Sequence, residues 1–140
     1  MDQLSLKRVL EGGFSRGPRG HSKWLGVEMT GLGDDWAEIR LPEQAGRWMS
    51  GRRGVFVAGP LVTLIDSASA TAVLAKLGEL RSVTTVDMRL DMVRRAHPGQ
   101  PLVARGECYS LAGHVALVRT TAHDGNPDDP IALAMTSFYI

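Results

Sequence analysis

Asp66 is the residue of this sequence whose side chain most needs a chemical explanation. It lies within residues 59–78, GPLVTLIDSASATAVLAKLG, where apolar residues recur at helical spacing and occupy nearly every side. Burying an unpaired carboxylate on such a helix is costly, so we expect Asp66 to have either a chemical role or a bonding partner. A carboxylate can act as a nucleophile or as a general base. The structural alternative is a carboxylate that only bonds Thr63, an arginine or a backbone group.

The helix that carries Asp66 is predicted over residues 60–77. Pro60 suits a first helical turn, because its fixed φ and its missing N–H cost nothing there, and Gly78 supplies a helix stop. The run is long and apolar enough to raise the question of a membrane span. Because Lys76, Asp66 and several serines and threonines interrupt it, we expect a buried core helix and no membrane partner.

Segments on both sides of this helix alternate apolar and polar residues, as β-strands do. We predict a hairpin before the helix and four strands after it, at residues 24–33, 34–41, 82–94, 101–111, 114–123 and 131–140. Residues 2–12 are expected to form a short surface helix and 14–23 a loop. A long polar connection is expected over 42–54, and turn formers at 124–130 join the last two strands.

This order of elements predicts an α+β fold in one domain over residues 1–140. An antiparallel sheet of five or six strands would wrap around one long central helix, at about 60–77. The first 20 residues would add the N-terminal helix and a loop. The sequence shows no internal repeat, low-complexity segment or domain linker.

Composition narrows the classes of function. The chain has 140 residues, of which 44% are hydrophobic and 22% charged, and its formal net charge is +1. Such a charge argues against broad attraction to nucleic acid or to an anionic membrane. The single Cys108 excludes an internal disulfide, and the four histidines lack metal-ligand spacing, so we expect a cytoplasmic protein without a metal site. Cys108 itself is predicted to be a packed core thiol.

Four stretches together resemble the PaaI-like thioesterases of the hot dog fold. They are GPLVTLIDSASATAVL at 59–74, SVTTVDMRLDMVRRAHPGQPLVARGE at 82–107, LAGHVALVRTTAHD at 111–124 and IALAMTSFYI at 131–140. The family carries a carboxylate in the central helix, an S/T-V-D element on the next strand and an RPA-x-PG corner after it. Asp66, Thr85-Val86-Asp87 and the residues 94–99 match these in order and spacing.

The resemblance implies hydrolysis of an acyl-CoA thioester, with coenzyme A as part of the substrate and no further cofactor. Asp66 would be the nucleophile or the general base. The oxyanion would be bound by a backbone N–H at the helix start, for which Ala58 is the nearer match and Gly59 the next. Thr85 would position water or substrate. Because the family's active site lies between subunits, we expect a homodimer or a homotetramer.

Further residues are candidates for binding the substrate. Arg94 and Arg95 could bind the phosphates of coenzyme A, and Thr84 lies beside Thr85. Trp48 and Phe56 could form a wall of the acyl pocket. The alternatives are a solvated basic rim for the arginines, ordinary strand residues for the threonines, and anchoring of the long connection for the two aromatic residues.

The sequence also departs from the family pattern. Many relatives have His-Gly-Gly before the helix, where this chain has Val57-Ala58-Gly59, and Gly51 stands where some relatives carry Asn or Gln. The competing hypothesis is therefore a catalytically silent hot dog module that binds acyl-CoA or a partner protein. Residues 124–127, DGNP, resemble a motif of hot dog hydratases, but Asp128 and Asp129 follow them, so a hairpin turn is the better interpretation.

Overall fold

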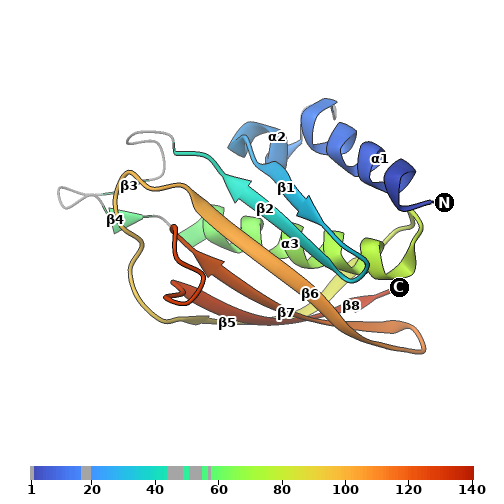
Figure 1. Ribbon diagram of the computed structural model, residues 1–140. Coiled ribbons are helices and arrows are strands. Elements are labelled where there is room, and N and C mark those ends of the chain that lie inside the picture. Colours follow the sequence, from blue (N-terminus) through green and yellow to red (C-terminus); the bar gives the residue numbers. More distant parts are fainter. Residues whose placement is uncertain (1, 17–19, 44–48, 51–54, 57) are drawn as a thin grey trace.

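The computed structural model describes residues 2–16, 20–43, 49–50, 55–56 and 58–140. Its elements follow the chain as α1 (Gln3–Arg16), α2 (His21–Leu25), β1 (Glu28–Leu32), β2 (Trp36–Leu41), β3 (Met49–Ser50), β4 (Val55–Phe56), α3 (Ala58–Leu77), β5 (Thr84–Met92), β6 (Leu102–Ala112), β7 (Val115–His123) and β8 (Ala132–Tyr139). The central helix and the four strands after it are confirmed to within a residue or two. Figure 1 shows them in place.

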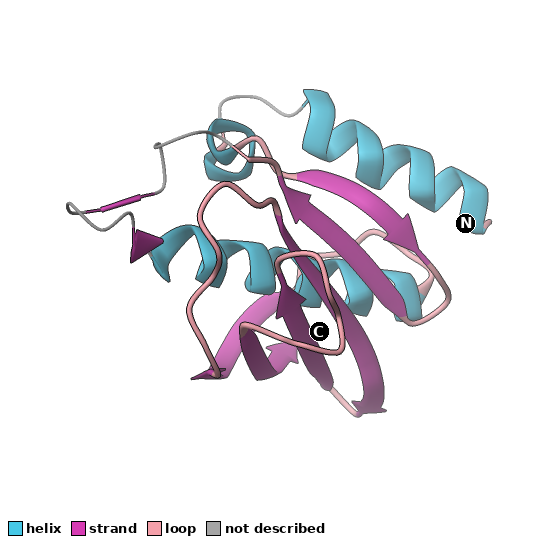
Figure 2. Cartoon of the chain, turned by 60° about the vertical axis from the view of Figure 1, so that its left-hand side comes forward, coloured by secondary structure: helices cyan, strands magenta, loops and turns pink. Residues whose placement is uncertain are grey.

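The main sheet has six antiparallel strands in the order β1-β2-β6-β7-β8-β5. It curves around α3, so that the helix lies in the concave side of the sheet (Figures 1 and 2). The predicted antiparallel sheet around one long helix is therefore confirmed. The strands β3 and β4 pair with each other in a small separate sheet. The strand β3 lies within the polar connection predicted over 42–54, and β4 follows directly after it.

The helix α3 forms the centre of the core because almost all of its sides are apolar. Its buried residues pack against inward-facing residues of the sheet in two clusters, which include Leu61, Leu64 and Ile65 in one and Val73 with Phe138 in the other. By length and composition alone α3 could cross a membrane, but here the sheet covers much of it. The predicted burial on all sides is wrong in one respect, because Gly59, Val62 and Thr63 near its start are not fully covered.

Small residues let α3 lie very close to the sheet. A Cβ on Gly106 of β6 would lie 2.8 Å from the carbonyl oxygen of Ala68, so only glycine fits this crossing. Beside it, the Ser69 hydroxyl donates to the Ile65 carbonyl at 2.8 Å and shares a 2.7 Å hydrogen bond with the Thr120 hydroxyl of β7. These buried polar groups are satisfied, and they fix the position of α3 over β6 and β7.

The N-terminal region differs from the sequence prediction. The helix α1 continues to Arg16, and residues 21–25 form a second helix, where a loop and the start of a strand were predicted. The helix α2 ends at Gly26, whose φ of 76° is left-handed and whose N–H bonds the carbonyls of Ser22 and Lys23. Five residues are too few for apolar spacing to distinguish a helix from a strand, and Leu25 is the residue of this helix that the fold buries.

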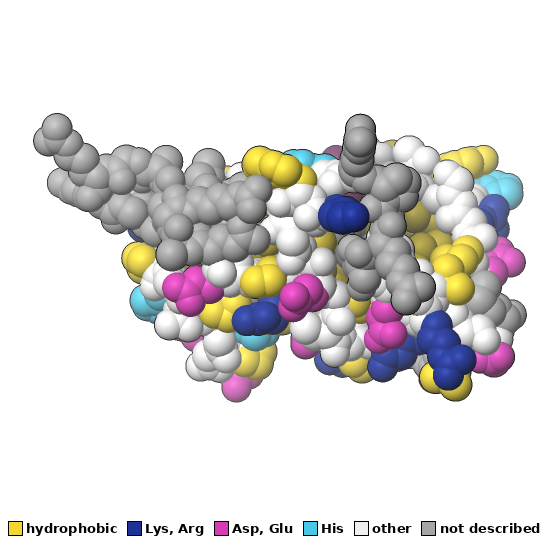
Figure 3. Space-filling model, turned by 90° about the horizontal axis from the view of Figure 1, so that it is seen from above, with side chains coloured by type: hydrophobic (Ala, Val, Ile, Leu, Met, Phe, Trp, Pro, Cys, Tyr) yellow, Lys and Arg dark blue, Asp and Glu magenta, His cyan; other side chains and the backbone are white. Residues whose placement is uncertain are grey.

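The hairpin of β1 and β2 is confirmed, with Leu32 paired to Ala37 beside the turn. The turn between β6 and β7 is also confirmed, and Gly113 provides its left-handed residue with a φ of 60°. Viewed from the side of α1 and α2, acidic and basic side chains are interspersed over the described surface (Figure 3). This mixture agrees with the formal net charge of +1.

Candidate active site

The structure brings together Asp66 and Thr85, two of the residues singled out from the sequence. Thr85 donates a hydrogen bond from its Oγ1 to Oδ1 of Asp66 at 2.8 Å. Asp66 is half-buried on α3, about two turns from the start of the helix, and Thr85 lies near the start of β5. After α3 ends at Leu77, the chain turns at Gly78, whose φ is 66°, and returns along the helix as β5, and this return brings the two side chains into contact.

A β-bulge determines the direction in which Thr85 points. Farther along β5, Met88 and Leu90 face inward and pack against the core. Strict alternation would therefore turn Thr85 outward. In the pairing with β8, however, Thr85 lies opposite Phe138 and Asp87 lies opposite Ser137, so Val86 is an extra residue. The bulge reverses the alternation and turns Thr85 toward α3.

The predicted oxyanion donors lie at the start of α3. Ala58 begins the helix and, like Gly59, is exposed. Their N–H groups belong to the first turn, which has no acceptor within the helix, whereas Pro60 has no N–H to offer. Ala58 and Asp66 are separated by about 12 Å along the helix axis. Within one chain, the carboxylate and these donors are too far apart to contact the same carbonyl group.

His21 lies beside the start of α3, and no pattern in the sequence marked it as part of the site. Its Nε2 lies 3.2 Å from Oγ1 of Thr63, which is one helical turn before Asp66. The ring of His21 also stacks on Trp24, with centroids 5.9 Å apart and an interplanar angle of 20°. With Gly20 and Lys23, these two residues line a hollow of about 430 Å³. No spacing rule links residue 21 to residue 63, so only the docking of α2 on α3 reveals the contact.

Arg94 is engaged by acidic groups of its own chain. Its guanidinium donates to both carboxylate oxygens of Asp124, at 2.6 and 3.1 Å, and to the backbone carbonyl of Asp129 at 2.7 Å. His97 adds its backbone N–H, at 2.7 Å from Asp124 Oδ2. Arg94 holds the pKa of Asp124 well below its ordinary value, and Asp124 raises the pKa of Arg94. This cluster anchors the 124–130 turn, which confirms the predicted turn. The predicted contact of Arg94 with coenzyme A stays a prediction, and the phosphates would have to compete with these acidic groups.

The other candidates are placed less closely around Asp66. Thr84 is exposed and pairs with Tyr139, and Arg95 is exposed after the end of β5. Trp48 and the side chain of Phe56, as well as Val57 and Gly51, lie outside the described residues. Their predicted contacts therefore stay predictions.

Neither Cys108 nor the described histidine and acidic side chains form a further catalytic or metal site. Cys108 is buried in the core, as predicted, and burial raises the pKa of its thiol. Among the side chains that the structure describes, no group of three His, Cys, Asp or Glu residues is arranged to hold a metal ion.

Comparisons with known proteins identify a family for this chain and solved structures that share its architecture. A family model described as "Thioesterase superfamily" matches residues 54–131. A solved protein from Pseudomonas aeruginosa is 25% identical, with a TM-score of 0.81 over 98% of each chain. The PaaI protein of the E. coli phenylacetic acid degradation operon is 16% identical, with a TM-score of 0.80 over 98% of this chain and 95% of its own. No curated protein sequence matches the chain.

A mutant of the phenylacetic acid degradation protein PaaI from Thermus thermophilus has the same fold. It is 21% identical, with a TM-score of 0.72 over 84% of this chain and 95% of its own. All three structures therefore agree with the hot dog arrangement of a sheet around one long helix.

Proposed function

Because this chain belongs to the thioesterase superfamily and has the hot dog fold, we propose that it hydrolyses the thioester bond of an acyl-CoA. The observation that carries this proposal is the hydrogen bond from Thr85 to Asp66 on a partly uncovered side of α3. Among the described residues, Thr85 is the donor to this carboxylate, and its second oxygen is left available. No described cation pairs with Asp66, so within this part of the chain it is oriented for chemistry without being neutralised.

The proposed reaction uses Asp66 as general base or as nucleophile. As a base, Asp66 removes a proton from water while the water oxygen attacks the thioester carbonyl carbon. The carbon–sulfur bond then breaks, and the thiolate of coenzyme A leaves and takes up the proton. As a nucleophile, Asp66 attacks the same carbon and displaces the thiolate of coenzyme A, which takes up a proton from water. The anhydride formed in this step is then hydrolysed by water, which releases the carboxylic acid and restores Asp66. In both routes the Thr85 hydroxyl orients the carboxylate.

The developing oxyanion would be bound by the N–H groups of Ala58 or Gly59, assisted by the positive end of the α3 dipole. Because these donors lie about 12 Å from Asp66 along the helix, we infer that they act on the substrate from a second chain. Each active site would then combine Asp66 of one chain with the helix start of the other. The protein is therefore proposed to work as a homodimer.

The edge of the sheet supports such a dimer. The strand β5 is the last in the sheet and pairs with β8, and no described strand pairs with its other edge. Val86 on this edge is 66% exposed, and Met92 and Val93 are also exposed. Pairing of two β5 edges in antiparallel fashion would extend the sheet across both chains and remove an edge prone to aggregation. It would also place the two α3 helices side by side in opposite directions.

The test measures hydrolysis of a panel of acyl-CoA thioesters, and the rate of hydrolysis is read from the release of free coenzyme A thiol. Asp66→Asn removes the charge but keeps an acceptor for Thr85, and it is expected to lower kcat by about 10²–10⁴-fold. The matched control is Asp128→Asn, an exposed acid in the 124–130 turn, which is expected to keep the wild-type rate. Unchanged rates in Asp66→Asn would refute the assignment. Binding of acyl-CoA by the wild type without turnover would instead support the silent module.

A further inference from the structure

Two consecutive hydrogen bonds connect α2 to the first turn of α3. Nε2 of His21 lies 3.2 Å from Oγ1 of Thr63, and this hydroxyl donates to the backbone carbonyl of Gly59 at 3.3 Å. A threonine hydroxyl has one hydrogen, so the His21 ring supplies the hydrogen of the first bond. His21 therefore acts, through Thr63, on the turn that carries the backbone N–H groups of Ala58 and Gly59.

The position of the His21 ring is fixed from more than one side, although the side chain is exposed. Leu25, about one helical turn after His21, is fully buried and belongs to the same core cluster as Leu61 and Leu64 of α3. Residues four apart on a helix share a face, so the burial of Leu25 directs His21 toward α3 as well. The ring also stacks on Trp24. These contacts make His21 an anchor between the two helices.

The first turn of α3 has no side chain of its own that could anchor it. Ala58 and Gly59 are exposed, and a Cβ built on Gly59 would have no atom within 4 Å. Glycine also leaves the backbone more conformational freedom than any other residue. Pro60 restricts its own φ but offers no N–H. The bond from the Thr63 hydroxyl to the Gly59 carbonyl therefore gives this turn an anchor that the turn itself lacks.

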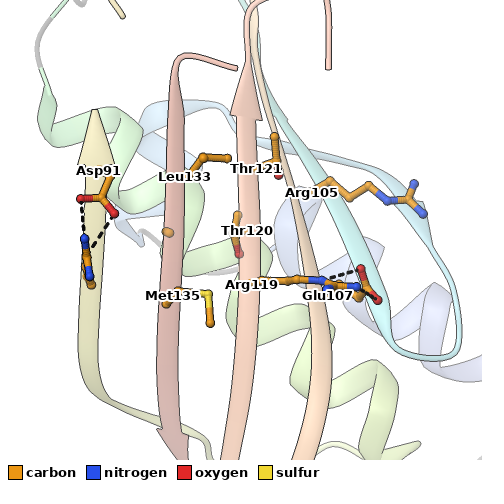
Figure 4. A pocket seen from close by; sticks show the side chains of 10 residues that line it. Asp91, Arg105, Glu107, Arg119, Thr120, Thr121, Leu133 and Met135 are labelled. Carbon is orange, nitrogen blue, oxygen red and sulfur yellow. Dashed lines mark hydrogen bonds and ion pairs between the residues drawn. The ribbon is translucent and has the colours of Figure 1, made fainter. Parts of the chain in front are cut away.

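The arginines of the sheet lie on its other side. The outer face, away from α3, carries a hollow of about 500 Å³ that is lined by Arg89, Arg105 and Arg119, among others. Figure 4 shows this hollow, with Arg119 paired to Glu107 at 2.9 Å. Because the sheet separates these three arginines from α3, they do not reach an oxyanion at the start of the helix. The proposed reaction assigns that charge to backbone N–H groups, whose effect depends on how firmly their turn is held.

We propose that His21 is a positioning residue for the hydrolysis, an inference that rests on the proposed function. Through Thr63 it holds the first turn of α3, so that the N–H groups of Ala58 and Gly59 keep the direction that the oxyanion requires. Donors stabilise a transition state best when they are oriented before the charge develops. Because the oxyanion is absent from the bound substrate, loss of His21 should lower kcat and leave KM nearly unchanged.

The experiment separates the N–H donor of His21 from its ring. His21→Phe keeps a ring that can stack on Trp24 but has no donor, and it is expected to lower kcat by about tenfold with KM within about twofold of wild type. His21→Gln restores an N–H donor and should recover most of this loss. Thr63→Val should slow the reaction as much as His21→Phe does. The variant with both changes should be no slower than either one, because both interrupt the same pair of bonds.

A second measurement follows the turn without using activity. NMR relaxation gives order parameters for the backbone amides of Ala58 and Gly59, which are expected to be about 0.85 in the wild type and to fall toward about 0.6 in His21→Phe. The control is His114→Phe, an exposed histidine beside Tyr139 at the turn between β6 and β7, with ring centroids 5.8 Å apart. It should keep both the rate and the order parameters of the wild type, and circular dichroism confirms that every variant is folded.

Three results would overturn the inference. They are a wild-type kcat in His21→Phe, a loss of kcat without a fall in the order parameters, and a His21→Gln variant as slow as His21→Phe. Failure of the proposed function is a separate result. If the wild type hydrolyses no thioester, that function is refuted, and the order parameters still decide whether His21 holds the first turn of α3.

Discussion

The hydroxyl of Thr85 and the carboxylate of Asp66 are joined by a hydrogen bond of 2.8 Å that connects β5 to α3. The bond depends on the bulge at Val86, which takes this extra residue out of the pairing and so keeps Thr85 turned toward the helix. A polar contact on the partly uncovered side of α3 thus depends on a local irregularity in an edge strand. Bulges commonly re-aim a side chain next to an active site.

Removal of the Thr85 hydroxyl is expected to slow hydrolysis without abolishing it. Thr85→Ala leaves Asp66 charged but less well oriented, and loss of a hydrogen bond to a charged group predicts a decrease of about tenfold in kcat. Thr85→Ser keeps the donor and should retain most of the activity. Steady-state kinetics with the best acyl-CoA of the panel measures both. Equal losses in the alanine and serine variants would show that the methyl group matters and not the hydrogen bond.

Deletion of Val86 is expected to straighten β5 and to keep Thr85 turned toward α3. In this variant Thr85 directly precedes Asp87, and because Asp87 lies opposite Ser137 on the outer face, regular alternation leaves Thr85 opposite Phe138 on the inner face. We expect kcat to stay within about tenfold of the wild-type value, since the Thr85 hydroxyl still faces Asp66. The control Val86→Ala keeps the residue count and therefore the bulge. If the deletion variant is folded by circular dichroism and loses more activity than Thr85→Ala, Val86 has a role beyond the register of β5.

Gly106→Ala is expected to destabilise the fold, because its new Cβ would lie 2.8 Å from the backbone oxygen of Ala68. Backbone atoms of α3 cannot give way as a flexible side chain can, so we expect a loss of about 1–3 kcal/mol in the free energy of unfolding. Gly12→Ala, at a position with no atom within 4 Å of the new Cβ, is the control and should be neutral or slightly stabilising. Urea unfolding measures both, and equal stability of the two variants would contradict the close contact.

Asp124 is expected to stabilise the protein at neutral pH and to lose this effect in acid. Its side chain is 3% exposed, and Arg94 holds its pKa well below the ordinary value. The unfolded chain therefore binds this proton more readily, so the stabilisation is present above about pH 4 and is lost as the pH falls toward the lowered pKa. Asp124→Asn weakens hydrogen bonds that involve a charged group and should lower the free energy of unfolding by about 2 kcal/mol at pH 7.

The difference between wild type and Asp124→Asn should narrow when urea unfolding is repeated near pH 3. Asp128→Asn, an exposed acid in the same turn, serves as the control and should change little at either pH. If the difference in the free energy of unfolding between wild type and Asp124→Asn is the same at both pH values, the charge on Asp124 does not stabilise the turn.

The long elements of this fold could be predicted because their patterns are local. Apolar residues on every side of residues 60–77 and alternation after them are enough for a helix and four strands. The helix α2 was missed because five residues give no usable period, and β3 and β4 were missed because each has two residues. Short elements are determined by what they pack against, which the sequence order does not reveal.

Some residues of the candidate site could be predicted from the sequence and others could not. Asp66 stood out because a charge interrupts an apolar run, and Thr85 followed from the family pattern. The proximity of His21 to Thr63 and the pairing of Arg94 with Asp124 join residues far apart in the chain. Two adjacent arginines suggested phosphate binding, yet one of them bonds a carboxylate that the sequence places thirty residues away. Only tertiary structure distinguishes an arginine available to a ligand from one that holds a turn.

The pairing of β2 with β6 has a consequence for how the chain folds. Trp36 pairs with Glu107, so the segment that contains α3 and β5 lies between two strands that must meet. The hairpin of β1 and β2 is made early in the chain, but it can join the sheet only after β6 exists. Closing such a long loop costs conformational entropy before the pairing can form. Folds in which distant segments pair therefore fold slowly, over about milliseconds to seconds. A nascent chain that has emerged only as far as α3 therefore still lacks the strand that its first hairpin needs.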